Sequence, residues 1–256
     1  MNLGRGSGRW LSWIVPRVLP ALVLGCLVAG PARASYQATV DSNESAFAPP
    51  CVDFVDSFPA KMLTAAKAAF VDLGYNTAAY TTTQFTRSHT LMRTVNDWSY
   101  YAHSHGDYYW HSGDGRRYTG YREDGGDCNQ PVIFSKDVAA KRAGRQSNLV
   151  VMSMCHNADA NTTMPGAFGI SKSKATGDSW NGPEFFLGYL GTAFDNDEWT
   201  FEQRFWDALG DDHSVGRAFD IAMLGNFAHS DFDADWWGSY NWYGLPGLLD
   251  PCRTCV

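Results

Sequence analysis

Short apolar runs alternate along this chain with segments that are rich in helix-forming residues. The run 149–154 is apolar except at Ser153, and the run 98–103 is rich in aromatic residues. Such runs are typical of strands buried on both faces, as in a parallel sheet. The segments 60–73, 136–145 and 199–209 carry helical composition or helical period. This alternation predicts an α/β fold, a three-layer αβα sandwich with a mainly parallel sheet.

The remaining segments complete this pattern. Glycine at 74 follows the helix predicted at 60–73, as is common at helix ends. The segment 106–130 carries glycines, charges and aromatic residues without a regular period, which indicates a long loop or a β-hairpin. We expect further strands at 36–40, 75–82, 184–194 and within 235–249, and further helices at 88–95 and 214–227.

Two of the predicted strands end in residues that can carry out nucleophilic chemistry. The run from Trp98 leads into His105-Gly106, and the run from Leu149 leads into Cys155. In parallel sheets, catalytic groups gather where the strands end. An imidazole beside a thiol can activate the thiol as a nucleophile and carry its proton. We therefore expect His105 and Cys155 as a catalytic pair, with the backbone N–H groups of Gly106 and Cys155 as oxyanion donors.

The first residues have the pattern of a secretory signal peptide. Basic residues precede an apolar core at 18–30, and an Ala-x-Ala site places the expected cleavage after Ala34. The apolar core is short for a membrane span and contains Pro20. A lipid-attachment site at Cys26 is an alternative, although apolar residues continue beyond it. We expect a secreted protein with a single domain at 35–256.

Charge and composition exclude some classes of partner. The predicted signal segment carries four arginines and no acidic residue, so its removal would change the formal net charge from −7 to −11. An acidic chain is a poor ligand for nucleic acid or for an anionic membrane surface. Abundant aromatic residues and the absence of low-complexity sequence predict a folded chain. The oligomeric state cannot be predicted from the sequence.

Cysteine usage supports the choice of nucleophile. Without Cys26, five cysteines remain, so one must stay unpaired in an oxidising compartment. Cys155 alone ends a strand of the buried type, and we predict that it is the free one. The other four cysteines allow three disulfide pairings, which the sequence leaves open; they are Cys51, Cys128, Cys252 and Cys255.

The order of these motifs resembles that of caspase-like cysteine peptidases, with the greatest likeness to bacterial gingipain-type and CHAT-type members. A strand ending in His-Gly precedes, by about fifty residues, a strand ending in Ser-x-Cys. Similar later motifs are Phe186-Leu187-Gly188-Tyr189, Phe205-Trp206-Asp207-Ala208-Leu209, His213-Ser214-Val215-Gly216-Arg217-Ala218 and Tyr243-Gly244-Leu245-Pro246. The resemblance implies a caspase-like fold and cysteine-dependent hydrolysis of peptides or proteins, with His105 and Cys155 as the dyad and Gly106 as an oxyanion donor.

Two alternatives stay open. The stretch His103-Ser104-His105-Gly106-Asp107 is similar to the first part of the His-x-His-x-Asp-His motif of metal-dependent hydrolases. Alternatively, the protein is a catalytically inactive caspase-like binding protein, in which the aromatic residues at 236–243 form a binding platform. For the peptidase we expect no cofactor; calcium would suit the acidic chain, but no calcium-binding motif is present.

Overall fold

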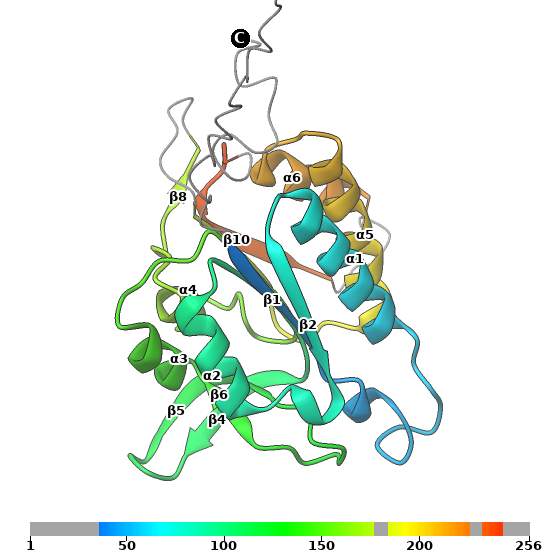
Figure 1. Cartoon of the computed structure of the whole chain (residues 1–256), viewed down its shortest axis with the longest axis vertical. Helices are drawn as coiled ribbons and strands as arrows, with labels where there is room; N and C mark the ends of the chain where they lie inside the picture. The colour runs from blue at the N-terminus through cyan, green and yellow to red at the C-terminus, as the bar shows by residue number, and fades with distance from the viewer. Residues whose placement is uncertain (1–35, 177–183, 226–231, 243–256) are drawn as a thin grey trace, which may run out of the picture. The chain divides into compact units, whose positions relative to one another are not determined.

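The computed structural model describes residues 36–176, 184–225 and 232–242, all within one compact unit, Ser35–Val256. Its main sheet has seven strands in the order β2-β1-β3-β7-β9-β10-β8 (Figure 1). The five strands from β2 to β9 are mutually parallel, and β10 runs antiparallel to β9. The strands are β1 (Gln37–Ser42), β2 (Asn76–Thr81), β3 (Ser99–His103), β7 (Leu149–Ser153), β8 (Lys174–Ala175), β9 (Phe185–Tyr189) and β10 (Ala234–Ser239).

The central strands are buried on both faces, as their apolar runs predict. In β7, Leu149 and Val151 belong to one hydrophobic cluster, whereas Val150 and Met152 belong to a second. Side chains alternate between the two faces of a strand, so each strand contributes to both clusters. The sheet therefore lies between two apolar cores, and the expected three-layer α/β sandwich is confirmed.

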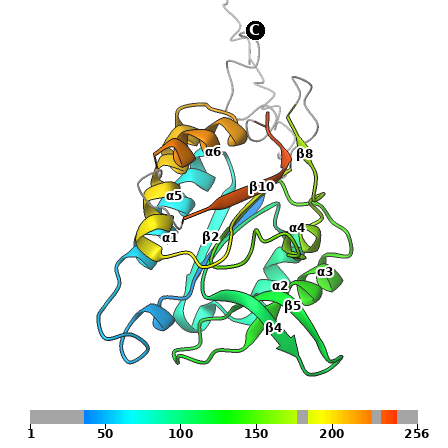
Figure 2. The same cartoon turned by 180° about the vertical axis from the view of Figure 1, so that it is seen from behind.

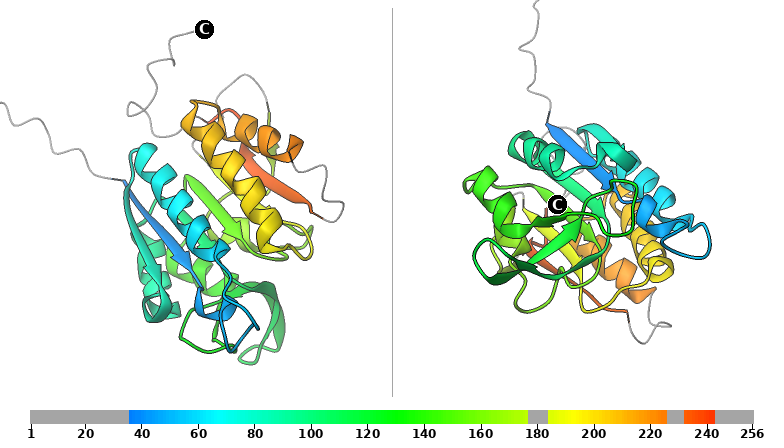
Figure 3. Two further views of the ribbon diagram at one scale, coloured as in Figure 1. Left: turned by 90° about the vertical axis from the view of Figure 1, so that its right-hand side faces the viewer. Right: turned by 90° about the horizontal axis from the view of Figure 1, so that it is seen from below.

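Helices cover the two faces of the sheet (Figures 1 and 2). On one face, α5 packs against both α1 and α6, and Figure 3 shows α1 and α5 side by side. On the other face, α3 packs against α2 and α4. The helices are α1 (Phe58–Asp72), α2 (Arg87–Asn96), α3 (Ser135–Arg142), α4 (Met164–Ala167), α5 (Asp195–Gly210) and α6 (Val215–Leu224). Gly74, after α1, has a positive φ of 86°, a conformation that favours glycine.

A second, smaller sheet begins shortly after the end of β3. Its antiparallel strands are β4 (Gly106–His111), β5 (Arg116–Arg122) and β6 (Val132–Phe134), in that order. Of the two structures expected for 106–130, a loop or a hairpin, the chain forms the β4–β5 hairpin and then a loop that leads to β6. Two short 3-10 helices complete the described elements, η1 (Ser45–Phe47) and η2 (Thr82–Gln84).

None of the helices in the described ranges combines the length and the apolar composition that crossing a membrane requires. The predicted signal peptide, Cys26, Cys252, Cys255 and the Tyr243–Pro246 motif lie outside the described residues, so the expectations about them stay predictions.

Candidate active site

Strands β3 and β7 end next to each other at one edge of the main sheet. They are parallel neighbours, with His103 opposite Ser153, and the Ser104 N–H donates to the Ser153 carbonyl at 3.2 Å. His105 and Cys155 each lie two residues beyond these strand ends. Both strands stop earlier than their apolar runs suggest, and after β3 the chain turns at Ser104 to begin the small sheet. The two predicted residues still reach the same edge.

Gly106, which follows the end of β3, packs directly against the backbone that follows the end of β7. A Cβ atom at Gly106 would lie 2.3 Å from the Cys155 carbonyl oxygen and 2.7 Å from Asn157 Nδ2. The Asn157 amide donates to that same carbonyl at 2.9 Å. Any side chain at position 106 would therefore collide with the backbone that carries the thiol. Glycine is required here by close packing.

Cys155 is a free, half-buried cysteine, as predicted from the odd cysteine count. Its Sγ atom lies 3.6 Å from the Ala193 carbonyl oxygen and 3.4 Å from the Ala193 nitrogen, in the loop between β9 and α5. Burial raises the pKa of the thiol, and the nearby carboxylates of Glu198 and Asp195 raise it further. The thiol is consequently protonated at neutral pH in the substrate-free protein.

The His105 ring lies at the exposed edge, next to η1. It packs against the Phe47 ring with a centroid distance of 4.5 Å. Desolvation by the surrounding protein lowers the pKa of His105, and the neighbouring His103 lowers it further. The imidazole is therefore neutral at pH 7 and can accept a proton. The Arg122 N–H donates to the His105 carbonyl at 3.1 Å, which fixes its backbone.

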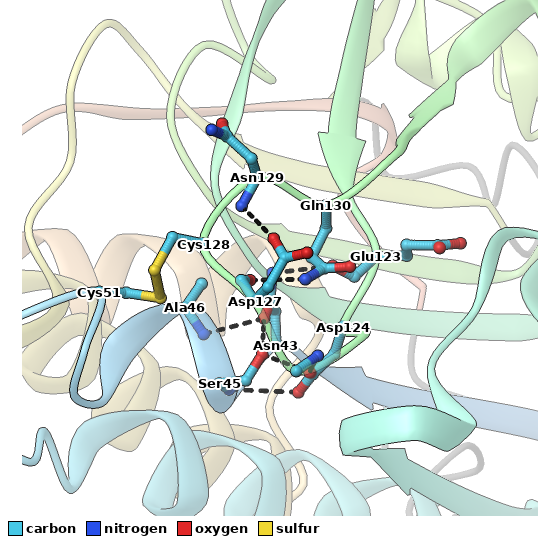
Figure 4. The surroundings of a disulfide bond; sticks show 11 residues. Asn43, Ser45, Ala46, Cys51, Glu123, Asp124, Asp127, Cys128, Asn129 and Gln130 are labelled. Atoms are coloured by element: carbon cyan, nitrogen blue, oxygen red, sulfur yellow. Dashed lines mark hydrogen bonds between the residues drawn. A yellow bond between two sulfur atoms is a disulfide. The ribbon is translucent and has the colours of Figure 1, made fainter.

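The loop that carries η1 is attached to the rest of the molecule by a disulfide and by polar side chains (Figure 4). Cys51 and Cys128 form the disulfide, which is one of the three pairings the sequence allowed. The Asn43 side-chain amide donates to the Glu123 carbonyl at 3.1 Å, and its oxygen accepts from the Ala46 N–H at 3.2 Å. This arrangement fixes the loop whose Phe47 ring packs against the imidazole of His105.

His103 lies in a buried polar cluster against α5. It is fully buried, and its Nε2 atom lies 3.3 Å from Asp195 Oδ1 and 3.8 Å from Glu198 Oε2. Ser153 Oγ donates to Glu198 at 3.0 Å. Burial raises the pKa of Glu198 to about 8. The carboxylates raise the pKa of His103, which outweighs the opposite effect of burial.

Sequence reasoning did not connect the carboxylates of this cluster with His103. Glu202 completes it by accepting hydrogen bonds from the hydroxyls of Tyr101 and Tyr189, both at 2.9 Å. Asp195, Glu198 and Glu202 are spaced three and four residues apart, which places them on one face of a helix. The same helix buries Phe201 and Phe205. Acidic residues at helical spacing among buried aromatic residues were the available signal.

The two alternative sites have different outcomes. His103 does not join Asp107, whose Oδ1 accepts from the adjacent Tyr108 N–H, but contacts the acidic residues of α5. The expected aromatic platform is mostly core: Trp236, Trp237 and Trp242 are at most 7% exposed, and Trp236 stacks on Phe185. Exposed aromatic side chains of this segment therefore do not form a broad binding face within the described residues.

Comparisons with known proteins give structural similarities only. No protein-family model matches the chain, and no curated protein matches it. Similar solved structures include the Arg-specific cysteine proteinase gingipain R, with a TM-score of 0.49 and 9% identity, over 76% of this chain and 42% of that one. The chain thus spans less than half of gingipain R.

Two further similar structures cover most of both chains. One is a protein from Geobacter sulfurreducens, with a TM-score of 0.47 and 10% identity over 85% of this chain and 96% of that one. The other is the Drosophila initiator caspase Dronc, with a TM-score of 0.46 and 12% identity over 84% of each chain. At TM-scores below 0.5 and identities of 9–12%, these similarities carry no argument about this chain, and its chemistry must be argued from the residues of the site.

Proposed function

We propose that this protein is a cysteine peptidase in which Cys155 is the nucleophile and His105 is the general acid and base. The observation that carries the proposal is that a free thiol and an imidazole lie just beyond the ends of two neighbouring parallel strands, at one sheet edge. The Gly106 contact locks the two strand ends together. A nucleophile and a nearby base are the central components of nucleophilic catalysis.

The pKa directions favour one order of proton transfers. The thiol begins protonated and the imidazole neutral, so His105 removes the Cys155 proton as Sγ attacks the peptide carbonyl carbon. The new C–S bond gives a tetrahedral oxyanion, for which the backbone N–H groups of Gly106 and Cys155 are the proposed donors. His105 then protonates the departing amine as the C–N bond breaks. Water hydrolyses the resulting thioester and regenerates the thiol.

A secreted location fits the presence of a disulfide in the chain. The disulfide Cys51–Cys128 belongs to proteins of oxidising compartments. The free thiol of Cys155 remains reduced beside it because it has no cysteine partner among the described residues. The proposed substrates are therefore peptides or proteins encountered outside the cytoplasm.

The test compares the wild-type protein with Cys155→Ala and His105→Ala on a mixed peptide library, with cleavage followed by mass spectrometry. We expect both variants to lose at least about 10³-fold in turnover, since removal of a nucleophile or base has effects of this size or larger. His111→Ala is the matched control, because His111 pairs with Asp114 on the hairpin, away from the strand ends. Cleavage that survives in Cys155→Ala would refute the proposal.

One observation favours the alternative of an inactive caspase-like binding protein. Among the described residues, the thiol of Cys155 makes its hydrogen bonds with Ala193 and not with His105. If this arrangement persisted with a peptide bound, the base could not remove the thiol proton. An inactive protein would bind peptides equally well with Cys155 or with Ala at this position, and would cleave none of the library.

A further inference from the structure

The cluster around His103 has the atoms and the spacing of a metal site. One atom each from His103, Asp195 and Glu198 lie within 4.8 Å of one another. All three come from rigid elements, because His103 ends β3 while Asp195 and Glu198 begin the sixteen-residue helix α5. A site on rigid elements holds its ligand atoms in a constant arrangement.

The distances within this cluster suit coordination as well as hydrogen bonding. His103 Nε2 lies 3.3 Å from Asp195 Oδ1, which is a long hydrogen bond, and 3.8 Å from Glu198 Oε2. Two ligands at about 2.1 Å from a tetrahedral zinc ion lie about 3.4 Å apart. The separation of the His103 and Asp195 atoms is therefore close to the one that a shared zinc ion would give.

The cluster also has more acceptors than donors. Asp195 Oδ2 is buried and has no hydrogen-bond partner among the described residues. Asp56 adds another carboxyl close to Asp195. The ion pairs that lysine and arginine form within the described ranges go to other carboxylates, namely those of Asp97, Asp114, Asp137 and Asp235. An acceptor that is buried without a donor is stabilised by a bound cation.

We propose that His103, Asp195 and Glu198 bind a divalent transition-metal ion, with zinc as the best-suited metal. An imidazole with two carboxylates is a ligand set for zinc and similar ions, whereas calcium prefers six or more oxygen ligands. Asp195 keeps a side-chain exposure of 16%, which leaves access for the ion from solvent. The ion would tie α5 to the end of β3, directly behind the edge that carries His105. The cluster adjoins the proposed catalytic pair, but none of its three ligands is assigned a step in the peptidase chemistry.

The experiment measures zinc content in the full chain with Cys155→Ala as the background, so that the thiol cannot contribute a ligand. The chain is stripped with a chelator, dialysed against buffered zinc, and analysed by elemental mass spectrometry. We expect one zinc per chain in the background protein. We expect a near-complete loss of zinc when His103→Gln or Glu198→Gln is added.

Matched controls separate this site from other histidines. Adding His105→Gln or His111→Gln to the background should leave one zinc per chain, since neither belongs to the cluster. Circular dichroism and the zinc-dependent rise in Tm check folding; if His103→Gln does not fold, Glu198→Gln decides. A background protein without stoichiometric zinc, zinc retained in a folded Glu198→Gln variant, or binding of calcium in preference to zinc would overturn the proposal. Because the background has no nucleophile, these outcomes are independent of peptidase activity.

Discussion

Gly106 lies against Cys155 so closely that a Cβ atom at position 106 would be 2.3 Å from the Cys155 carbonyl oxygen. This contact links the strand that leads to the histidine with the strand that leads to the cysteine. It depends on the absence of a side chain, because the obstructing atoms belong to backbone and cannot rotate away. The following predictions test the role of this edge and of the groups around it.

Gly106→Ala should destabilise the protein and disturb the active-site edge together. Forcing a methyl group into filled space costs typically about 1–3 kcal/mol in the free energy of unfolding, which urea denaturation would measure. Gly166→Ala in α4 is the matched control, because a Cβ there meets nothing within 4 Å. An equally stable Gly106→Ala variant would show that the strand ends can separate without cost.

Removal of the disulfide should weaken the whole fold. Cys51 and Cys128 are 77 residues apart in sequence, and closing a loop of that length corresponds to about 4 kcal/mol of stabilisation on the chain-entropy estimate. We expect the Cys51→Ser/Cys128→Ser variant to unfold at lower urea concentration than the wild type. Reductant should destabilise the wild type and leave the variant unchanged. If reductant did not destabilise the wild type at intermediate urea concentration, this expectation would be contradicted.

The pH dependence of peptide cleavage should be set by the neutral imidazole of His105. The pKa of His105 is lowered from about 6.5, so the imidazole stays an available base below that pH. We expect kcat/KM to hold its value down to below pH 6.5 before it declines. A pH profile with an acidic limb centred well above 6.5 would show that another group controls the reaction.

Alkylation of Cys155 should become fast only at high pH in the substrate-free protein. Burial raises the pKa of this thiol, so its reaction with iodoacetamide should be slow at pH 7 and should accelerate above pH 9. Labelling can be assigned to Cys155 by peptide mass. Fast labelling at pH 6, slowed by His105→Ala, would instead reveal a preformed thiolate–imidazolium pair.

Stability should decrease as pH rises, partly because of Asp41. Burial raises the pKa of this carboxyl from 3.8 to about 7, so the folded state binds a proton that the unfolded state has lost. The stabilisation is fully present below about pH 4 and disappears as pH rises through about 7. Asp41→Asn should flatten this decline in the free energy of unfolding. Asp107→Asn, at an exposed carboxyl, is the control and should keep the wild-type profile.

Local patterns predicted most of the elements correctly. Apolar runs marked β3, β7 and β9, and helical composition marked α1, α3 and α5 within a few residues. The boundaries differed most at the strand ends, where Ser104 begins the turn into the small sheet instead of continuing β3 to His105. A turn of this kind is set by pairing with β5, which lies later in the chain, so the apolar pattern cannot indicate it.

The amino-acid sequence by itself determined the layer architecture, the identity of the free cysteine and the shared edge of His105 and Cys155. Period, composition and cysteine count are local or additive properties, and parallel strands bring their ends together whatever their exact register. Only the tertiary structure decided which acidic residues surround His103, which cysteine pairs with Cys51, and that Phe47 packs against the imidazole of His105. Asp195 and Glu198 follow His103 by about ninety residues. Such contacts arise when α5 packs on the sheet, and no pattern within a short segment specifies that packing.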